Sequence, residues 1–344
     1  MFTEESFENV VIEYLKELNY DYIHGSNLTR DNKEVPLLKN LKTNLININK
    51  EIPESSIDYA IKKIQNFETN DVFTNNKLFH KYLTEGIEIT DFIDGKTVYN
   101  TVKLIDYDNI QNNEFLVVNQ LEIVENDVKK IPDVVVYVNG IPLVCMELKS
   151  TSREEVTIED AYNQLMNYKE VHIPSLFYYN AFLVISDGIN TKAGTITAPF
   201  NRFMDWKKIN IEDEVKDTLG VDYKNLDTLL YGMFDKERFL DIIKNFILFI
   251  PKGKILAQYH QYYGMKKAIN SVINAVDNDG RAGVVWHTQG SGKSFSMTFL
   301  AGNLIKDKRL ESPTILVITD RNDLDDQLYS TFCSASEFLR QEPI

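Results

Sequence analysis

Two apolar runs joined by an Asn-Gly pair constrain this chain more than any other feature. Residues 131–138 (IPDVVVYV) and 141–148 (IPLVCMEL) are rich in β-branched residues, and Asn139 and Gly140 lie between them. An Asn-Gly pair between two such runs is a strong local signal for an antiparallel β-hairpin. Both runs are almost wholly apolar, so charged side chains on one face of this hairpin need a functional reason.

Three charged residues interrupt the apolar pattern: Asp133 in the first run, and Glu147 and Lys149 at the end of the second. Residues two apart on a strand share a face, so Glu147 and Lys149 point the same way. Asp133 joins them if it lies opposite Glu147, whereas a strict two-residue turn would turn it to the other face. The sequence therefore predicts either a three-residue loop, 139–141, or a β-bulge that restores the alignment.

Two carboxylates on one face of a hairpin repel each other unless a cation lies between them. Mg²⁺, which prefers oxygen ligands and keeps several waters, is the expected occupant, with Asp133 and Glu147 as metal ligands. Lys149 would then orient or deprotonate an attacking water, or stabilise a phosphorane. The alternative is a surface hairpin whose Glu–Lys pair adds little stability.

The next predicted helix, residues 157–170, carries Gln164 and Tyr168 four residues apart, so these two side chains share one face. An apolar run at 181–188 follows and is expected to be a buried strand. Helical spacing of apolar residues also predicts a helix at 3–20, and shorter helices near 54–67 and 71–83. Strands are expected near 101–107 and 113–124.

A second motif, VVWHTQGSGKS at 284–294, has the form of a phosphate-binding loop. A β-rich run enters a Gly-rich turn that opens a helix, where backbone N–H groups attract phosphate. Lys293 would reach the β- and γ-phosphates and Ser294 the Mg²⁺. His287 stands where the strict template has Gly, and a plain flexible loop is the alternative. The expected nucleotide contacts are Thr288, Gly290, Ser291, Gly292, Lys293 and Ser294.

Upstream, AQYHQYY at 257–263 places glutamines among tyrosines. An amide pairs with both the donor and the acceptor of adenine, so Gln258 or Gln261 could read an adenine base. An ordinary polar helix face is the alternative. From residue 265 onward helix, strand (282–288), helix and strand (313–319) alternate, which predicts a parallel sheet.

Charge and composition narrow the possible functions. The formal net charge of −14 argues against a strongly basic surface that grips DNA alone, although it leaves room for a local groove or for DNA held by partners. Two cysteines, Cys145 and Cys333, suit a reducing cytoplasm. Residues 1–11 contain no basic residue, so a secretory signal is not expected. No apolar run approaches the roughly 20 residues that span a bilayer, so we expect a cytoplasmic protein without membrane contact.

Together, residues 131–149 and AYNQLMNYK at 161–169 resemble the PD-(D/E)xK nuclease core in its RecB-like form. The segment NGIPLV, with FLVVNQLEI upstream and HTQGSGKS downstream, resembles the restriction (R) subunit of type I restriction-modification enzymes. The resemblance implies an α/β fold: a nuclease core with a mixed sheet flanked by helices, then the beginning of a RecA-like P-loop lobe with a parallel sheet.

By resemblance, Asp133 and Glu147 bind metal, Lys149 is the catalytic lysine, and Gln164 and Tyr168 help to position DNA or the active-site loop. A Glu of the N-terminal helix often completes such sites, and Glu8 is the predicted one, although Glu4, Glu5 and Glu13 are equally acidic. Gln261 stands at the place of the family's adenine-reading glutamine.

The resemblance implies three regions: an endonuclease domain at 1–205, a helical linker at 206–255, and an incomplete first ATPase lobe at 256–344. It also implies Mg²⁺-dependent cleavage of double-stranded DNA, coupled in the full enzyme to ATP-driven translocation. Methyltransferase (M) and specificity (S) subunits would be partners, with S-adenosylmethionine bound through them. Motifs for hydrolysis are not found before Ile344, so ATPase activity is not expected of this chain alone.

Two alternatives remain open. A superfamily 2 motor with a degenerate nuclease would keep HTQGSGKS and lack DNA cleavage. A non-catalytic docking module would bind neither metal nor nucleotide.

Overall fold

Six strands form the central sheet of the first part of the chain in the computed structural model, which describes residues 4–93, 96–149, 156–210, 212, 224–320 and 322–340. The chain divides into two units, Met1–Leu240 and Asp241–Ile344. The strand order is β1 (Asp21–His24), β4 (Phe115–Asn119), β7 (Val134–Val138), β8 (Ile141–Leu148), β9 (Phe182–Ser186) and β10 (Thr191–Gly194). β1 runs parallel to β4 and β8 parallel to β9, while the other neighbours are antiparallel. The sheet is therefore mixed, as predicted.

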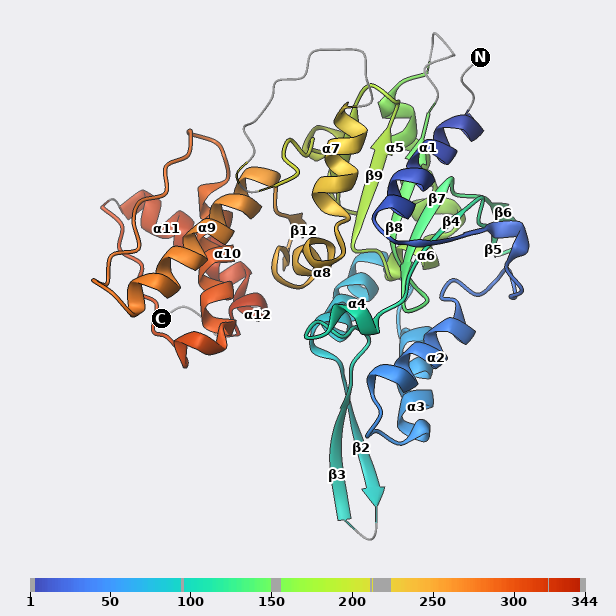
Figure 1. Cartoon of the computed structure of the whole chain (residues 1–344), viewed down its shortest axis with the longest axis horizontal. Helices are drawn as coiled ribbons and strands as arrows, with labels where there is room; N and C mark the ends of the chain where they lie inside the picture. The colour runs from blue at the N-terminus through green and yellow to red at the C-terminus, as the bar shows by residue number, and fades with distance from the viewer. Residues whose placement is uncertain are drawn as a thin grey trace. The chain divides into compact units, whose positions relative to one another are not determined.

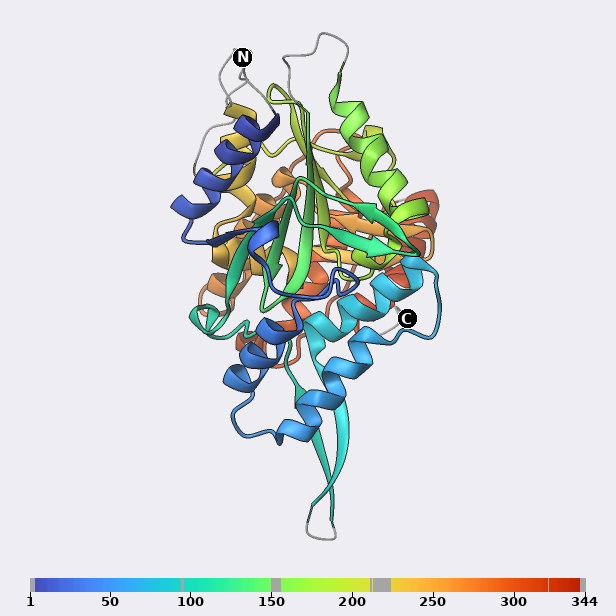
Figure 2. The ribbon, with the colours of Figure 1, turned by 90° about the vertical axis from the view of Figure 1, so that its right-hand side faces the viewer.

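Helices cover both faces of this sheet (Figure 2). α1 (Glu4–Glu17) packs on β1, β4 and β8 and also contacts α7 (Lys224–Met233), whereas α5 (Ile158–Asn167) packs on β8 and β9 from the other face. The strands β4, β7, β8 and β9 are consequently buried along their whole length. This explains why they consist of apolar runs without alternation.

The β7–β8 hairpin has a two-residue turn and a bulge. Val138 pairs with Ile141 and Tyr137 with Pro142, but Val136 pairs with Val144, so Leu143 has no opposing residue. Both turn residues have positive φ, 51° for Asn139 and 78° for Gly140, as a type I′ turn requires. The prediction of a bulge is confirmed, and the alternative three-residue loop is wrong.

The turn of this hairpin is buried inside the unit. Asn139 has no exposed surface, and its Nδ2 donates to the carbonyl of Leu104 at 3.0 Å and to Asn113 Oδ1 at 2.8 Å. A Cβ at Gly140 would lie 2.7 Å from both Leu37 O and Leu41 N, so α2 (Leu38–Ile48) approaches the turn closely. The hairpin is thus anchored at the end opposite to its charged residues.

A two-stranded ribbon projects from the first unit (Figure 1). It consists of β2 (Ile87–Ile93) and β3 (Lys96–Val102), and α3 (Glu54–Gln65) packs on both strands. α4 (Val72–Glu85) leads into β2, so the helices predicted near 54–67 and 71–83 are both present. The strand predicted at 101–107 lies instead at 96–102. The segment after Lys103 leaves the ribbon because Leu104 and Ile105 are buried in the core.

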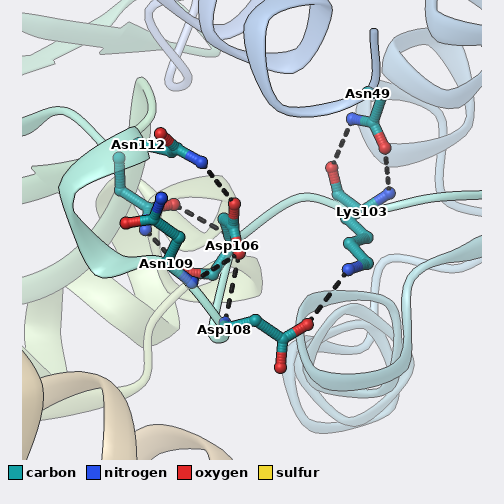
Figure 3. A network of polar contacts seen from close by, with 7 residues as sticks. Asn49, Lys103, Asp106, Asp108, Asn109 and Asn112 are labelled. Carbon is teal, nitrogen blue, oxygen red and sulfur yellow. Dashed lines mark hydrogen bonds and ion pairs between the residues drawn. The ribbon is translucent and has the colours of Figure 1, made fainter. Parts of the chain in front are cut away.

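Polar side chains fix the root of this ribbon (Figure 3). The Asn49 amide bonds both backbone groups of Lys103, each at 2.9 Å, and Lys103 Nζ lies 3.3 Å from Asp108 Oδ2. Asp106 accepts hydrogen bonds from the backbone of Asp108 and Asn109 and from the Asn112 side chain. Much of the Asn-rich sequence is therefore used to fold loops around the sheet.

The remaining elements of the first unit are short. β5 (Ile123–Glu125) and β6 (Val128–Lys130) form a small hairpin after β4. A π-helical turn, η3 (Tyr168–His172), follows α5 directly, and α6 (Pro174–Tyr178) leads into β9. η1 (Gly25–Asn27), η2 (Ile110–Asn112) and η4 (Phe200–Arg202) are single 3₁₀ turns.

The second unit is mainly helical in its described part. α8 (Lys236–Asn245) leads to the hairpin β11 (Ile247–Ile250) and β12 (Gly253–Leu256), and the helices are α9 (Tyr259–Val276), α10 (Lys293–Lys306), α11 (Asn322–Ser334) and α12 (Ser336–Leu339), with the 3₁₀ turn η5 (Lys308–Leu310). Phe246 packs against Tyr262 and Phe299, which joins the hairpin to α9 and α10.

The parallel sheet predicted for this unit is not formed by its described residues. Segments 282–288 and 313–319 are not strands, and Val284, Trp286, Leu316 and Ile318 are at least 80% exposed. A strand requires hydrogen-bonded neighbours, and neither segment has a paired strand in the part of the unit that the structure describes. The apolar sequence alone cannot supply such neighbours. Among the described helices, none combines the length and the apolar character needed to cross a membrane.

Candidate functional site

The charged residues of the hairpin meet at its open end. Val134 pairs with Met146, and the same register continued by one residue sets Asp133 opposite Glu147. Asp133 Oδ2 accepts a hydrogen bond from the backbone N–H of Leu148 at 2.7 Å, so the aspartate side chain reaches across to β8. The bulge at Leu143 makes this possible, because without it the two carboxylates would lie on opposite faces.

Glu147 is the most unusual group in the first unit. Its side chain has no exposed surface, and among the described residues no N–H or O–H group donates to its Oε2. The Asp133 carboxyl is within hydrogen-bonding reach of the Glu147 carboxyl. Burial raises the pKa of the Glu147 carboxyl well above its usual range, the neighbouring Asp133 carboxylate raises it further, and Lys149 offsets part of the rise. A buried carboxyl with an unsatisfied oxygen is costly to maintain unless a ligand compensates it.

Lys149 provides part of that compensation. Its Nζ lies 2.9 Å from Glu147 Oε1, and its side chain is 12% exposed. Its backbone N–H donates to the carbonyl of Ser186 at 2.8 Å, which continues the pairing of β8 with β9 beyond the strand. The ammonium group is thus held beside the two carboxylates at the surface end of the site.

Gln164 and Tyr168 lie on the helix that covers this end of β8. Gln164 Nε2 donates to the Tyr168 hydroxyl at 2.7 Å. Burial raises the pKa of Tyr168 far above its ordinary value, and the carboxylates of Glu147 and Asp133 add to the rise. Tyr168 also begins the π-helical turn, closed by Ile173 N–H to Tyr168 O at 2.8 Å. Such turns are frequent at functional sites.

Glu8 lies at the same end of the sheet but is bound separately. It is 3% exposed, and it accepts hydrogen bonds from Asn119 Nδ2 at 3.0 Å and from Gln120 Nε2 at 2.8 Å. Helix α1 brings it from the face opposite to α5. The structure therefore places Asp133, Lys149 and Tyr168 beside Glu147. Gln164 joins this group through the Tyr168 hydroxyl, while the Glu8 carboxylate is engaged by two amides at the end of β4.

The residues at the open end of the hairpin fit a divalent cation. The unsatisfied Glu147 Oε2 and the facing Asp133 carboxylate supply hard oxygen ligands, which Mg²⁺ prefers. Within the described ranges, no group of three or more His, Cys, Asp or Glu side chains is arranged to hold a metal. Water and substrate oxygens would have to complete the coordination, as is usual for Mg²⁺.

The Gly-rich loop of the second unit leads into α10. Gly290 and Gly292 have φ of 79° and 75°, and Gly292 is the N-cap residue of the helix. Lys293 Nζ donates to the carbonyls of His287 and Thr288 at 3.2 and 3.0 Å, so the lysine folds back over the loop. Ser291 Oγ is buried, and none of the residues that the structure describes forms a hydrogen bond with it. The helix start thus has the form expected of a phosphate site.

Gln261 holds this loop through its amide. Its Oε1 accepts from the backbone N–H of Gln258 at 2.9 Å, and its Nε2 donates to the Gly292 carbonyl at 3.0 Å. The His260 ring contacts the Ser291 carbonyl at 3.1 Å and packs edge-on against His287. Burial lowers the pKa of His287, and the neighbouring His260 and Lys293 lower it further. Both ends of the Gln261 amide are occupied by backbone groups here.

Two features of the first site escaped the sequence analysis. The π-helical turn at 168–172 has no compositional signal. The pair Asn119-Gln120 was included only as part of FLVVNQLEI, yet both amides bind Glu8. Two adjacent amide side chains at the end of an apolar strand are the sequence signal that could have indicated donors to a buried carboxylate.

Two family models match parts of the chain. Residues 1–202 match the family model "Type I restriction enzyme R protein N terminus", and residues 260–343 match "SWI2/SNF2 ATPase". The chain is 38% identical over 360 residues to the type I restriction enzyme HindI endonuclease subunit of Haemophilus influenzae, an alignment that covers 100% of the chain and 34% of the relative.

A second relative, the putative type I restriction enzyme MjaIXP endonuclease subunit of Methanocaldococcus jannaschii, is 38% identical over 98% of the chain and 35% of its own length. A Staphylococcus aureus endonuclease subunit is 24% identical over 96% of the chain. The chain spans about a third of the length of these curated relatives. From the family match and these identities, the chain belongs to the type I restriction enzyme R (endonuclease) subunit family.

Proposed function

We propose that this chain carries the endonuclease site of a type I restriction enzyme, a PD-(D/E)xK site that cleaves double-stranded DNA with Mg²⁺. The observation that supports the proposal most is the Glu147 carboxyl, which is fully buried beside Asp133 and receives no hydrogen bond at Oε2 from the described part of the chain. A structural hairpin gains nothing from this arrangement, whereas a site that binds a cation requires it.

In this proposal Asp133 and Glu147 hold the cation, and each has a defined support. Leu148 N–H fixes one oxygen of Asp133, and Lys149 Nζ fixes one oxygen of Glu147. When bound, Mg²⁺ would polarise the scissile phosphate and lower the pKa of a water. Lys149 Nζ would orient the attacking water or stabilise charge on the phosphate. Gln164 and Tyr168 would position the DNA strand or the loop after β8.

We further propose that the Gly-rich loop binds ATP in the longer enzyme. The N–H groups of 290–294 would surround the phosphates, Lys293 would leave the carbonyls of His287 and Thr288 to reach them, and Ser294 would meet Mg²⁺. Gln261 would exchange a backbone partner for adenine. Translocation along DNA belongs to the complete R subunit, with M and S subunits and S-adenosylmethionine supplied by the assembly.

Calorimetric titration with Mn²⁺ tests the metal site on this chain. The wild type is expected to bind one ion, and Glu147→Gln is expected to lose binding because a neutral amide replaces the buried ligand. Glu114→Gln is the matched control, since Glu114 is a partly buried carboxylate at the opposite end of the hairpin, bound by Asn40 and Asn44. Equal binding by wild type and Glu147→Gln would contradict the proposal.

Cleavage is tested in the assembled enzyme with a full-length R subunit. Glu147→Ala is expected to abolish DNA cleavage while ATPase activity is retained. The rival function, a motor with a degenerate nuclease, is favoured by one observation, that no third metal-ligating side chain joins Asp133 and Glu147 among the described residues. That rival predicts cleavage unchanged by Glu147→Ala and no Mn²⁺ bound by the wild type.

A further inference from the structure

The residue after β4 connects Asp133, a proposed metal ligand, with the Glu8 carboxylate of α1. Gln120, the residue after β4, donates its backbone N–H to the carbonyl of Asp133 at 3.0 Å. Its side-chain Nε2 donates to Glu8 Oε1 at 2.8 Å. One residue therefore binds the peptide of the proposed metal ligand with its backbone and the carboxylate of α1 with its side chain.

The conformation of Gln120 is unusual and tightly enclosed. Its φ is 50°, a left-handed conformation that glutamine rarely adopts. A Cβ at Gly25 would lie 2.3 Å from the Gln120 carbonyl oxygen, so the chain after β1 closes over this peptide. A left-handed conformation of this kind is strained for a residue with a Cβ, and it persists only where surrounding contacts hold it.

Asn119 supports the same carboxylate from the neighbouring position. Its Nδ2 donates to Glu8 Oε2 at 3.0 Å, and its Oδ1 accepts from the Tyr22 hydroxyl at 3.1 Å. Both oxygens of Glu8 are thus bound, and the 3%-exposed carboxylate is fixed to the sheet. Asp133 is likewise held twice, by Gln120 N–H at its carbonyl and by Leu148 N–H at its carboxylate.

We infer that Gln120 is a positioning residue of the metal site: it fixes Asp133 for the cation and keeps the α1 carboxylate at the same end of the sheet. The inference rests on the proposed function, since it concerns a cation held by Asp133 and Glu147. Residues that orient metal ligands in this way affect metal affinity by about 10- to 100-fold when they are changed.

The test is Mn²⁺ calorimetry on this chain with Gln120→Gly. This change removes the side-chain amide that ties the Gln120 peptide, and through its N–H also Asp133, to Glu8. Glycine tolerates positive φ and retains the backbone N–H, so a loss of affinity reports the lost anchoring by the side chain. Mn²⁺ affinity should fall about 10-fold or more with an unchanged melting temperature. Asn19→Gly is the matched control, another left-handed residue, φ 63°, at the far end of α1 from Glu8, and it should bind as the wild type does. If Gln120→Gly lowers the melting temperature, Gln120→Asn, which also tolerates positive φ, takes its place.

A second readout separates positioning from catalysis. In the assembled enzyme, Gln120→Gly should raise the Mg²⁺ concentration needed for half-maximal cleavage, and saturating Mg²⁺ should restore the wild-type rate. An unchanged Mn²⁺ affinity, or a rate that saturating Mg²⁺ does not restore, overturns the inference. If the wild-type chain binds no Mn²⁺, both the proposed function and this inference are overturned. That outcome is distinguished from failure of the inference alone because it is seen in the protein without any substitution.

Discussion

Glu147 is the side chain on which the proposed function of the first unit depends most. It is buried, it lies beside the Asp133 carboxyl, and one of its oxygens is paired with Lys149, while the other receives no hydrogen bond from the residues described. Removing the ammonium group of Lys149 is expected to lower the stability of the folded state, because it leaves the buried Glu147 charge unpaired. Neutralising Glu147 itself is expected to remove the free-energy cost of burying that charge. Its energetics therefore differ between the metal-free and the metal-bound protein.

The pH dependence of stability follows from this. Because the folded-state pKa of Glu147 is raised above its ordinary value of 4.5, the metal-free folded state binds more protons than the unfolded state between those two values. Stability should therefore be lost as pH rises from about 4.5 toward the raised pKa. Glu147→Gln should remove this slope and be more stable than the wild type at pH 8.

Urea denaturation of the wild type and of Glu147→Gln from pH 5 to pH 8, with EDTA present, measures this difference. The two proteins should be nearly equal at pH 5, and added Mg²⁺ should stabilise only the wild type. Parallel pH profiles for the two proteins would show that the carboxyl does not titrate as described.

Among the elements, the β7–β8 hairpin determines whether the proposed ligands Asp133 and Glu147 face each other. Its tight turn alone would have separated Asp133 from Glu147, and the bulge at Leu143 restores their alignment. The turn itself is fixed by contacts from distant segments, with Leu37 N–H donating to the Gly140 carbonyl at 2.8 Å. Strand alignment at the site thus depends on packing at the opposite end of the hairpin.

Gly140→Ala tests this dependence. Alanine at φ 78° is strained, and its Cβ would meet Leu37 O and Leu41 N at 2.7 Å. We expect a loss of about 2–4 kcal/mol, from backbone strain plus overpacking. Gly280→Ala is the matched control, because Gly280 has φ of 73° but open space around it, so only the strain of about 1 kcal/mol remains.

Hydrogen exchange in increasing urea, followed by mass spectrometry, reports each unit separately through the peptides around 134–148 and 265–283. Equal losses for the two substitutions would mean that the turn is not anchored by α2. If Gly140→Ala also weakens Mn²⁺ binding, the alignment of the strands at the site depends on the turn.

At the scale of the whole molecule, the two units differ in how completely they bury their apolar sequence. The first unit encloses its sheet between helices, whereas in the second unit segments 282–288 and 313–319 leave large apolar side chains exposed. Exposed apolar surface of this kind binds hydrophobic probes and favours association.

The two tryptophans report on this contrast, because Trp206 is 4% exposed and Trp286 is 80% exposed. Acrylamide should quench the fluorescence of Trp286 efficiently and that of Trp206 poorly. Trp286→Phe should leave a protected emission, and Trp206→Phe an accessible one. A protected Trp286 in the Trp206→Phe variant would show that the 282–288 segment is covered in solution.

The sequence by itself determined the hairpin, the residues at its open end, the helix with Gln164 and Tyr168, and the Gly-rich turn before α10. These depend on short-range signals: turn residues, strand alternation and helical spacing. The family resemblance, now confirmed by the comparisons, also came from such local patterns. The domain limits at 205 and 255 stay a prediction, and residues 211 and 213–223 of the proposed linker lie outside the described part.

Only the tertiary structure decided between a bulge and a longer loop, assigned Glu8 to the amides of Asn119 and Gln120, and left the segments at 282–288 and 313–319 without strand partners. Each outcome depends on groups far apart in the chain. The position of a bulge depends on how both strands pack on their neighbours. The partners of a buried carboxylate depend on the donors that surround it, and a strand forms only where another strand is present to pair with it. Spacing along one sequence carries none of that information.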